Sequence, residues 1–321
     1  MRRLFGYYRQ FSELSPDEVS RSLREQRARL PVAEAPLDLS GAAWPGPPHP
    51  EVINAATFAL RRAVNAYPDD GPLRAAIAGS LGVDAERVVI GHGAGELLRA
   101  ALAAVAGAEV EVVWPGWGAL PSLVRSVGAT PVPVPAVTGT RTAVVCRPND
   151  PTGAVPSVSP GAEWLVLDEA LADFVDGGAP PLLEGERVIH VRSFSKGHAM
   201  AGFRVGYAIV PPGGPDLRPV MGVGAPALAG ALWAVEHGGL SLARRREQAA
   251  RSRARLAAEF PVADGVGPYA WLELPVAEEL ATRGVFVAPG AAWGRGDGVR
   301  VTLGDDAATD RLLDALRDVT S

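Results

Sequence analysis

The chain has 321 residues, of which 47% are hydrophobic and 21% charged, and its formal net charge at pH 7 is −5. This composition is typical of a globular protein with room for a large and a small domain, and no basic block indicates a nucleic-acid partner. Residues 1–11 lack the apolar stretch of a secretory signal and no run of about 18 apolar residues occurs, so we expect neither secretion nor a membrane span.

The first predicted helix starts at a capping box, Ser15-Pro16-Asp17-Glu18, and extends to about Leu30 as part of an N-terminal arm. A loop rich in proline and glycine at residues 43–50 precedes two segments with helical spacing, 51–66 and 72–81. Short apolar runs then alternate with helical segments at 96–106 and 119–127. These runs predict buried strands at residues 87–90, 109–114, 142–146, 164–167, 188–191 and 205–210. Such alternation predicts a mostly parallel sheet with helices on both faces.

The remainder of the chain predicts a second, smaller domain. A long helical stretch over residues 228–260, broken near Gly238-Gly239, leads into it. Strands are expected at residues 270–274, 285–287 and 299–303, followed by a closing helix at 307–319. We therefore predict an N-terminal arm at residues 1–39, a large α/β domain at 40–236 and a small α+β domain at 237–321.

Two residue types, lysine and cysteine, occur only once in the chain, and both are chemically informative. Lys196 is the only lysine, because arginine supplies the other 30 of the 31 basic residues. Arginine codon bias explains the depletion, but arginine cannot supply a deprotonated amine, so a retained lysine indicates amine chemistry unless it is a chance survivor. Cys146 is the only cysteine and lies in an apolar run, which predicts a buried strand residue rather than a nucleophile. The lack of any internal disulfide fits a cytoplasmic protein.

Three motifs follow predicted strands. They are Arg147-Pro148-Asn149-Asp150-Pro151-Thr152-Gly153, then Asp168-Glu169-Ala170, then Ser193-Phe194-Ser195-Lys196, with Ala201-Gly202-Phe203-Arg204-Val205-Gly206-Tyr207 shortly afterwards. In parallel sheets, ligands bind beyond the carboxyl ends of the strands. We therefore expect all three motifs at the mouth of one site.

The combination and spacing of these motifs resemble the fold-type-I class I/II aminotransferase superfamily, which uses pyridoxal 5'-phosphate (PLP). Within it the chain looks similar to the branch of histidinol-phosphate aminotransferases and threonine-phosphate decarboxylases, from about Leu39 to Gly304. The resemblance implies an aspartate aminotransferase-like three-layer large domain, PLP as cofactor, an amino-acid substrate, no metal ligands, and a homodimer with shared active sites.

The resemblance also implies roles for residues around the cofactor. Lys196 would form a Schiff base with PLP and later act as the general base at the substrate's Cα. Asp168 would pair with the ring nitrogen, and Asn149 would donate to the ring 3'-oxygen. The predicted phosphate ligands are Ser193, Ser195 and Arg204.

Further positions match the family less specifically. Gly93-Ala94-Gly95 opens a predicted helix whose free N–H groups suit a phosphate, although a tight turn is the alternative. Trp117 would stack on the cofactor ring unless it is plain core. Tyr67 matches a tyrosine that reaches the phosphate in the neighbouring subunit. Arg300 matches the arginine that binds the substrate's α-carboxylate, the alternative being a surface ion pair.

Two departures from the family bear on the substrate. Leu171 stands where many relatives have a tyrosine that helps to hold the ring 3'-oxygen. Ala288 stands where both phosphorylated-substrate families usually have an arginine for the substrate's phosphate, and an alanine offers no charge. Arg295 or His198 could substitute only from elsewhere in the chain. We therefore expect a substrate without a phosphate.

Three functions remain open on the sequence. Transamination of an amino acid is favoured, and decarboxylation or another Cα-bond cleavage on the same scaffold is the alternative. The third is a PLP-binding regulator without turnover, against which the complete set of Lys196, Asp168, Asn149 and Arg204 argues.

Overall fold

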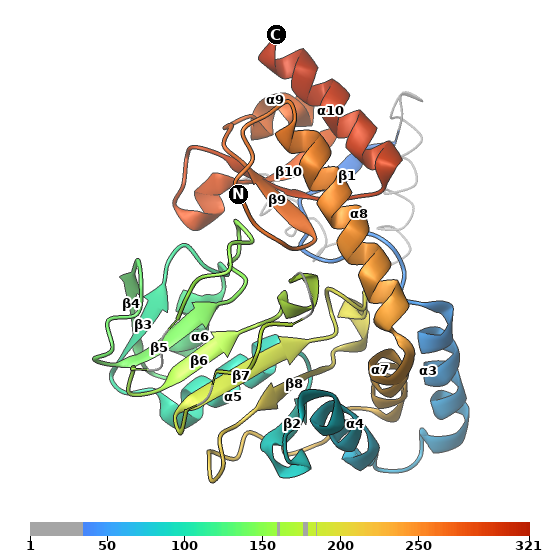
Figure 1. Cartoon of the computed structure of the whole chain (residues 1–321), viewed down its shortest axis with the longest axis vertical. Coiled ribbons are helices and arrows are strands. Elements are labelled where there is room, and N and C mark those ends of the chain that lie inside the picture. The colour runs from blue at the N-terminus through green and yellow to red at the C-terminus, as the bar shows by residue number, and fades with distance from the viewer. Residues whose placement is uncertain (1–34, 159–160, 176–178, 184) are drawn as a thin grey trace, which may run out of the picture. The chain divides into compact units, whose positions relative to one another are not determined.

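The computed structural model describes residues 35–158, 161–175, 179–183 and 185–321. The helix predicted for residues 15–30 and most of the predicted N-terminal arm lie outside these ranges. Two β-sheets with flanking helices make up most of the described chain (Figure 1).

The larger sheet has seven strands in the order β2-β8-β7-β6-β5-β3-β4. Only β8 is antiparallel to its neighbours, so the prediction of a mostly parallel sheet is confirmed. Strands β5, β6 and β7 are buried along their whole length, as expected for central strands covered on both faces. The strands are β2 (Val88–Gly91), β3 (Glu109–Val113), β4 (Thr130–Val134), β5 (Thr142–Cys146), β6 (Leu165–Asp168), β7 (Val188–Ser193) and β8 (Gly206–Ile209).

Successive residues of the central strands pack on opposite faces of this sheet. Val144 and Val166 join the cluster around α5, whereas Val145 and Leu167 belong to a cluster on the other face. A third cluster joins β2 to α3, α4 and α7. The helices of this part of the chain are α3 (Pro50–Ala63), α4 (Gly71–Leu81), α5 (Ala94–Val105), α6 (Leu120–Ser126) and α7 (Ala225–His237).

Strand β4 was not predicted, and its two prolines explain why. Pro131 and Pro133 cannot donate hydrogen bonds and lower the strand propensity of the segment. The strand forms because it lies at the edge of the sheet and pairs only with β3. A proline is tolerated where its missing N–H faces away from the neighbouring strand.

The smaller sheet has the strand order β1-β10-β11-β9. The helical stretch that leads into it is interrupted where predicted, because α7 ends at His237 and α8 starts at Gly239. Strand β1 and helix α9 are too short for periodicity to reveal them. The elements are β1 (Leu37–Leu39), α8 (Gly239–Ala257), β9 (Tyr269–Leu272), α9 (Ala277–Thr282), β10 (Val285–Pro289), β11 (Val299–Thr302) and α10 (Asp306–Thr320). The boundaries of the large and small domains stay a prediction.

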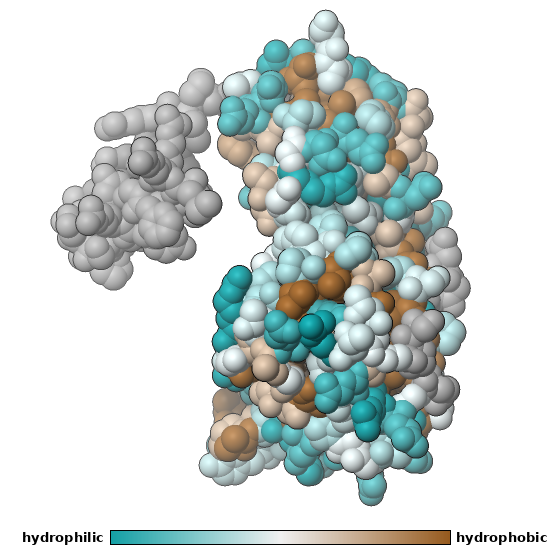
Figure 2. All heavy atoms as spheres, turned by 90° about the vertical axis from the view of Figure 1, so that its left-hand side faces the viewer, coloured by the Kyte–Doolittle hydropathy of each residue, from teal (hydrophilic) through white to brown (hydrophobic). Residues whose placement is uncertain are grey.

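Four short 3-10 segments complete the described secondary structure: η1 (Ala85–Arg87), η2 (Ala172–Phe174), η3 (Ala201–Phe203) and η4 (Gly290–Trp293). Within the described ranges, no helix has both the length and the apolar character needed to cross a membrane. On the face that Figure 2 presents, hydrophilic and hydrophobic residues are interspersed.

Candidate functional site

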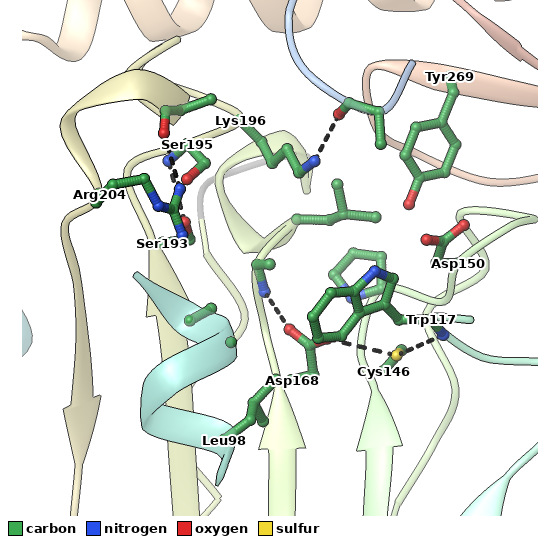
Figure 3. A pocket seen from close by; sticks show the side chains of 17 residues that line it. Leu98, Trp117, Cys146, Asp150, Asp168, Ser193, Ser195, Lys196, Arg204 and Tyr269 are labelled. Carbon is green, nitrogen blue, oxygen red and sulfur yellow. Dashed lines mark hydrogen bonds between the residues drawn. The ribbon is translucent and has the colours of Figure 1, made fainter. Parts of the chain in front are cut away.

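Most of the predicted site residues gather at the carboxyl ends of β5, β6 and β7. The parallel register sets Cys146 opposite Asp168 and Asp168 opposite Val191, so these strands end at one edge of the sheet. A cavity of about 250 Å³ lies there (Figure 3). Its lining residues are Ala42, Ala94, Gly95, Leu98, Trp117, Cys146, Pro148, Asp150, Asp168, Ala170, Leu171, Ser193, Ser195, Lys196, Ala201, Arg204 and Tyr269.

Lys196 extends into this cavity from the segment after β7 (Figure 3). Its Nζ donates a hydrogen bond to the backbone carbonyl of Ala42 at 2.8 Å. Burial lowers the pKa of the amine below its ordinary value, although the nearby Asp150 carboxylate opposes this shift. A larger fraction of Lys196 is therefore uncharged at neutral pH than for a lysine in water, which suits a nucleophile or a base.

Asp168 ends β6 and faces the same cavity. One oxygen accepts a hydrogen bond from the Ala170 N–H at 3.1 Å, and the other lies 3.6 Å from Sγ of Cys146. Burial raises the pKa of the Asp168 carboxyl to about 6. A cation placed beside Asp168 by a ligand would stabilise the ionised form.

The carboxylate next to Asp168 holds this part of the backbone in place. Glu169 is buried and accepts a hydrogen bond from Nε of Arg192 at 2.8 Å, with Nδ1 of His190 at 3.2 Å. Although burial opposes the shift, the His190 hydrogen bond and the Arg192 charge lower the pKa of Glu169. Both partners lie on β7, so this buried ion pair fastens the end of β6 to its neighbour.

One wall of the cavity, formed by residues at and after the end of β7 and by the start of α5, is suited to an anion. Ser193, Ser195 and Arg204 line it together with the N-terminal residues Ala94 and Gly95 of helix α5. N–H groups at the start of a helix point towards a bound anion and carry partial positive charge. The predicted phosphate ligands therefore share one cavity wall with the start of α5.

Gly93, the residue before α5, allows Arg204 to approach the helix. A Cβ atom at Gly93 would lie 2.5 Å from Nη2 of Arg204, and the glycine has a φ of 94°. Arg204 itself has a φ of 52° and donates to the carbonyl oxygens of Ala201 at 2.7 Å and His92 at 3.3 Å. Both features fix the guanidinium beside the start of α5.

The Asn149 side chain is not among the groups that line the cavity. Its Nδ2 donates to the carbonyl of Pro115 at 2.7 Å, and its Oδ1 accepts from the Thr152 hydroxyl at 2.9 Å. The neighbouring Asp150 lines the cavity instead. The donor role predicted for Asn149 thus gains no support from this geometry, which assigns Asn149 to the turn that positions Asp150.

Arg300 lies behind Asp150 rather than on the cavity wall. Its Nη1 is 3.0 Å and 3.2 Å from the two carboxylate oxygens of Asp150, and both side chains are buried. The sequence left two alternatives for Arg300, a carboxylate clamp and a surface ion pair. The structure shows an ion pair, but a buried one at the edge of the cavity.

Tyr269 is a lining residue that the sequence did not predict. It starts β9, and its hydroxyl points towards Asp150 (Figure 3). Burial raises the pKa of this phenol well above its ordinary value. Asp150 could have been found from the motif that contains it, whereas Tyr269 carries no local signal because a distant strand brings it to the cavity.

The structure shows what surrounds Leu171 and Ala288, the two residues that depart from the family pattern. Leu171 lines the cavity as an apolar residue. Ala288 packs in an aromatic cluster with Trp271 and Trp293. Of the two possible substitutes, Arg295 pairs with Asp297 at 2.7 Å, and His198 packs half-buried against Phe194, where desolvation lowers its pKa. Neither of them is among the residues that line the cavity.

Trp117 and Tyr67, the two aromatic ligands predicted for the cofactor, differ in their surroundings. Trp117 lines the cavity, and its backbone N–H donates to Sγ of Cys146 at 3.2 Å. Cys146 is buried and free, as predicted. Tyr67 is not a lining residue of its own chain's cavity, and 87% of it is exposed.

Comparison with known proteins gives a consistent result. Residues 36–316 match the family model described as Aminotransferase class I and II. An aromatic amino acid aminotransferase of Cutibacterium acnes is 31% identical in an alignment of 351 positions, which covers 93% of this chain and 97% of that relative.

Solved structures of aminotransferases share the fold. An aspartate aminotransferase from Thermotoga maritima has a TM-score of 0.78 at 20% identity, covering 97% of this chain and 99% of that one. A histidinol-phosphate aminotransferase from Sinorhizobium meliloti, solved in complex with pyridoxal-5'-phosphate, has a TM-score of 0.75 at 23% identity, covering 95% and 94%. The predicted aspartate aminotransferase-like fold is confirmed.

The buried carboxylate of Asp168 should destabilise the ligand-free protein at neutral pH. Because its pKa rises from 3.8 unfolded to about 6 folded, the folded state binds the proton more tightly, and stability falls as pH rises between these values. In urea unfolding at pH 7.5, Asp168→Asn should raise the free energy of unfolding by on the order of 3 kcal/mol. The gain should shrink towards pH 4.

The control is Asp84→Asn, since Asp84 is exposed and its side chain makes no cap hydrogen bond. It should change stability by less than about 0.5 kcal/mol at either pH. An Asp168→Asn protein that is no more stable than the parent at pH 7.5 would show that burial does not perturb this carboxylate.

Proposed function

Since the chain belongs to the aminotransferase class I and II family, we propose that it is a PLP-dependent aminotransferase whose amino donor is an amino acid with a large apolar, and in the simplest case aromatic, side chain. One observation carries the proposal. A single cavity brings together the only lysine of the chain, a buried carboxylate and a cationic wall beside a helix start. These are the groups that PLP chemistry requires.

The residues of the cavity fit PLP at its phosphate and at its ring nitrogen. Ser193, Ser195, Arg204 and the start of α5 would hold the phosphate, because they offer hydroxyls, a guanidinium and free N–H groups on one wall. Asp168 would accept from the protonated ring nitrogen. PLP, when bound, supplies an electron sink for the bonds at the substrate's Cα.

Lys196 would hold the cofactor covalently through Nζ and would then move the proton at the substrate's Cα. Its lowered pKa favours the uncharged amine that both tasks need. Trp117 would cover one face of the ring and limit its tilt. Asp168, fixed by the backbone N–H of Ala170, would keep the ring nitrogen protonated.

The charges around the cavity favour a donor without a phosphate. Among its lining residues, the cationic side chains are Lys196 and Arg204, and the cofactor would use both. Ala288 contributes only to an aromatic cluster. A substrate phosphate would be left without a charged partner, which is costly in a buried site. The name of the Cutibacterium acnes relative agrees with an aromatic donor.

A homodimer is part of the same proposal. Helix α3 exposes Ile53 and Leu60, and Val64 follows on the same side. Tyr67 and Met221 are also exposed, and the loop of Met221 is close to Tyr67 because Gly222 lies beside Pro68. Exposed apolar residues grouped in this way are typical of subunit interfaces. Tyr67 could then serve the cavity of the neighbouring subunit.

The activity can be tested with a panel of donors. PLP-loaded protein with 2-oxoglutarate should convert phenylalanine, tyrosine or tryptophan to the oxo acid, with kcat/KM at least about tenfold above that for histidinol phosphate. Release of CO2 in place of an oxo acid would contradict transamination and support the decarboxylase alternative. An absence of turnover with every donor would support the third alternative, a PLP-binding regulator without turnover.

Lys196→Arg is the most informative catalytic variant. It keeps a positive charge at this position but replaces the amine with a guanidinium. The guanidinium cannot deprotonate, so turnover should fall by about 1000-fold or more. The absorbance band of the covalently bound cofactor should also disappear. Retention of that band would exclude Lys196 as the attachment site.

Gly93→Ala should weaken PLP binding by about tenfold or more, because the new Cβ would displace Arg204 from the start of α5. Gly128→Ala is the matched control, since Gly128 also has a positive φ, 85°. Among the described residues, its two chain neighbours aside, no atom of another residue lies within 4 Å of where its Cβ would be. Fluorescence titration of the apoprotein measures both Kd values. Equal losses in the two variants would point to backbone strain alone.

The dimer can be tested by light scattering. The parent should have about twice the chain mass of 33.4 kDa, and the double variant Leu60→Glu/Val64→Glu should have the mass of one chain. Phe286→Glu, at an exposed apolar residue of β10, should leave the mass unchanged. A parent of single-chain mass would refute the shared-site arrangement.

A further inference from the structure

Asp150 stands between the cavity and Arg300. Asp150 lines the cavity, whereas Arg300 is not among the lining residues. The Arg300 Nη1 lies 3.0 Å and 3.2 Å from the two carboxylate oxygens, and the side chains are 8% and 10% exposed. The cavity therefore presents a carboxylate at the place where Arg300 would receive the carboxylate of a substrate.

Contacts other than the pair with Asp150 also hold Arg300 in place. Its guanidinium lies 4.8 Å from the ring centres of both Tyr269 and Trp293. Its Nη2 donates to the carbonyl oxygens of Ser40 at 3.1 Å and Gly41 at 3.3 Å. A carboxylate binds a guanidinium best through two N–H groups. Within the described part of the chain, Nε has no hydrogen-bond partner, whereas Nη1 is held by Asp150. A carboxylate that binds through Nη1 must therefore take the place of Asp150.

Each element around Asp150 contributes a titratable or charged group. Arg300 faces it from β11, Tyr269 from β9 and Lys196 from the segment after β7, while Asp168 and Cys146 lie at the ends of β6 and β5. Burial raises the pKa of the Asp150 carboxyl, and the Arg300 charge opposes the shift. While Asp150 is ionised, it cancels most of the attraction that Arg300 could exert on an anion in the cavity.

We propose that Asp150 determines substrate specificity by controlling the access of a substrate's carboxylate to Arg300, an inference that rests on the proposed function. With Asp150 ionised, the site favours a molecule that carries a neutral group at this end. With Asp150 neutral, Arg300 attracts the carboxylate. Asp150 is a positioning residue in this scheme, since it acts through Arg300.

The direct test uses Asp150→Asn in the PLP-loaded protein. Asparagine keeps an oxygen that accepts from Nη1 but removes the competing charge. The probes are 3-phenylpropanoate and its neutral amide, neither of which carries an amine that could react. Calorimetry should show the carboxylate binding about tenfold tighter or more to Asp150→Asn, with the amide Kd changed less than about twofold. Weaker or unchanged carboxylate binding would overturn the proposal, as would equal changes for both ligands.

The pH dependence of the parent protein provides a second test, which does not depend on the folding of the variant. The Kd of 3-phenylpropanoate should rise as the pH is raised through the pKa of Asp150, which burial holds above its ordinary value, while the Kd of the amide stays constant. Asp168→Asn should keep this dependence, which separates Asp150 from the other carboxylate of the cavity. A constant Kd for the carboxylate in the parent would overturn the proposal.

Steady-state kinetics distinguish this inference from the proposed function. If the parent turns over phenylalanine, Asp150→Asn should lower its KM by about tenfold with a smaller change in kcat. A parent that turns over no donor refutes the proposed function, and the two binding tests still decide the role of Asp150. A parent that turns over phenylalanine with a KM unaffected by Asp150→Asn refutes the inference alone.

Discussion

The hydrogen-bonded register of three parallel strands is the constraint on which the site depends. Because β5, β6 and β7 run in the same direction, their carboxyl ends meet at one edge of the sheet, with Cys146 opposite Asp168. Residues that are far apart in the sequence thereby face one cavity. The buried pair of Glu169 and Arg192 fastens two of these ends at 2.8 Å, so a shift of one strand would break an ion pair as well as the ladder.

The cavity is built at the expense of local backbone stability. Ala199 and Arg204 both have positive φ values, 57° and 52°, although neither is a glycine. Each such residue costs roughly 1–3 kcal/mol, and the surrounding structure must compensate. The segment between them connects β7 to β8, whose pairing with both neighbours is antiparallel. The strain therefore lies where the chain reverses and where Arg204 must turn towards the start of α5.

The sequence predicted the parts of this structure that depend on local patterns. Apolar runs revealed the buried strands, because a strand covered on both faces is mostly apolar. They missed β4, whose prolines are acceptable only at a sheet edge. The motif around residue 149 identified the right loop, but the side chain facing the cavity is Asp150, since Asn149 is used by its own turn. The pairing of Arg300 with Asp150 depends on contacts between distant strands, which no local pattern contains.

The two buried aspartates of the cavity differ in what already satisfies them. Asp150 has a guanidinium as its partner, so a ligand gains little by adding another cation there. Asp168 is held by a backbone N–H and a thiol, and burial keeps its pKa at about 6. A cationic ligand group beside Asp168 would relieve the cost of burying its charge, which is the larger electrostatic gain. In the proposed function, a protonated ring nitrogen would therefore bind beside Asp168, while Arg300 and Asp150 would determine which substrate can approach it.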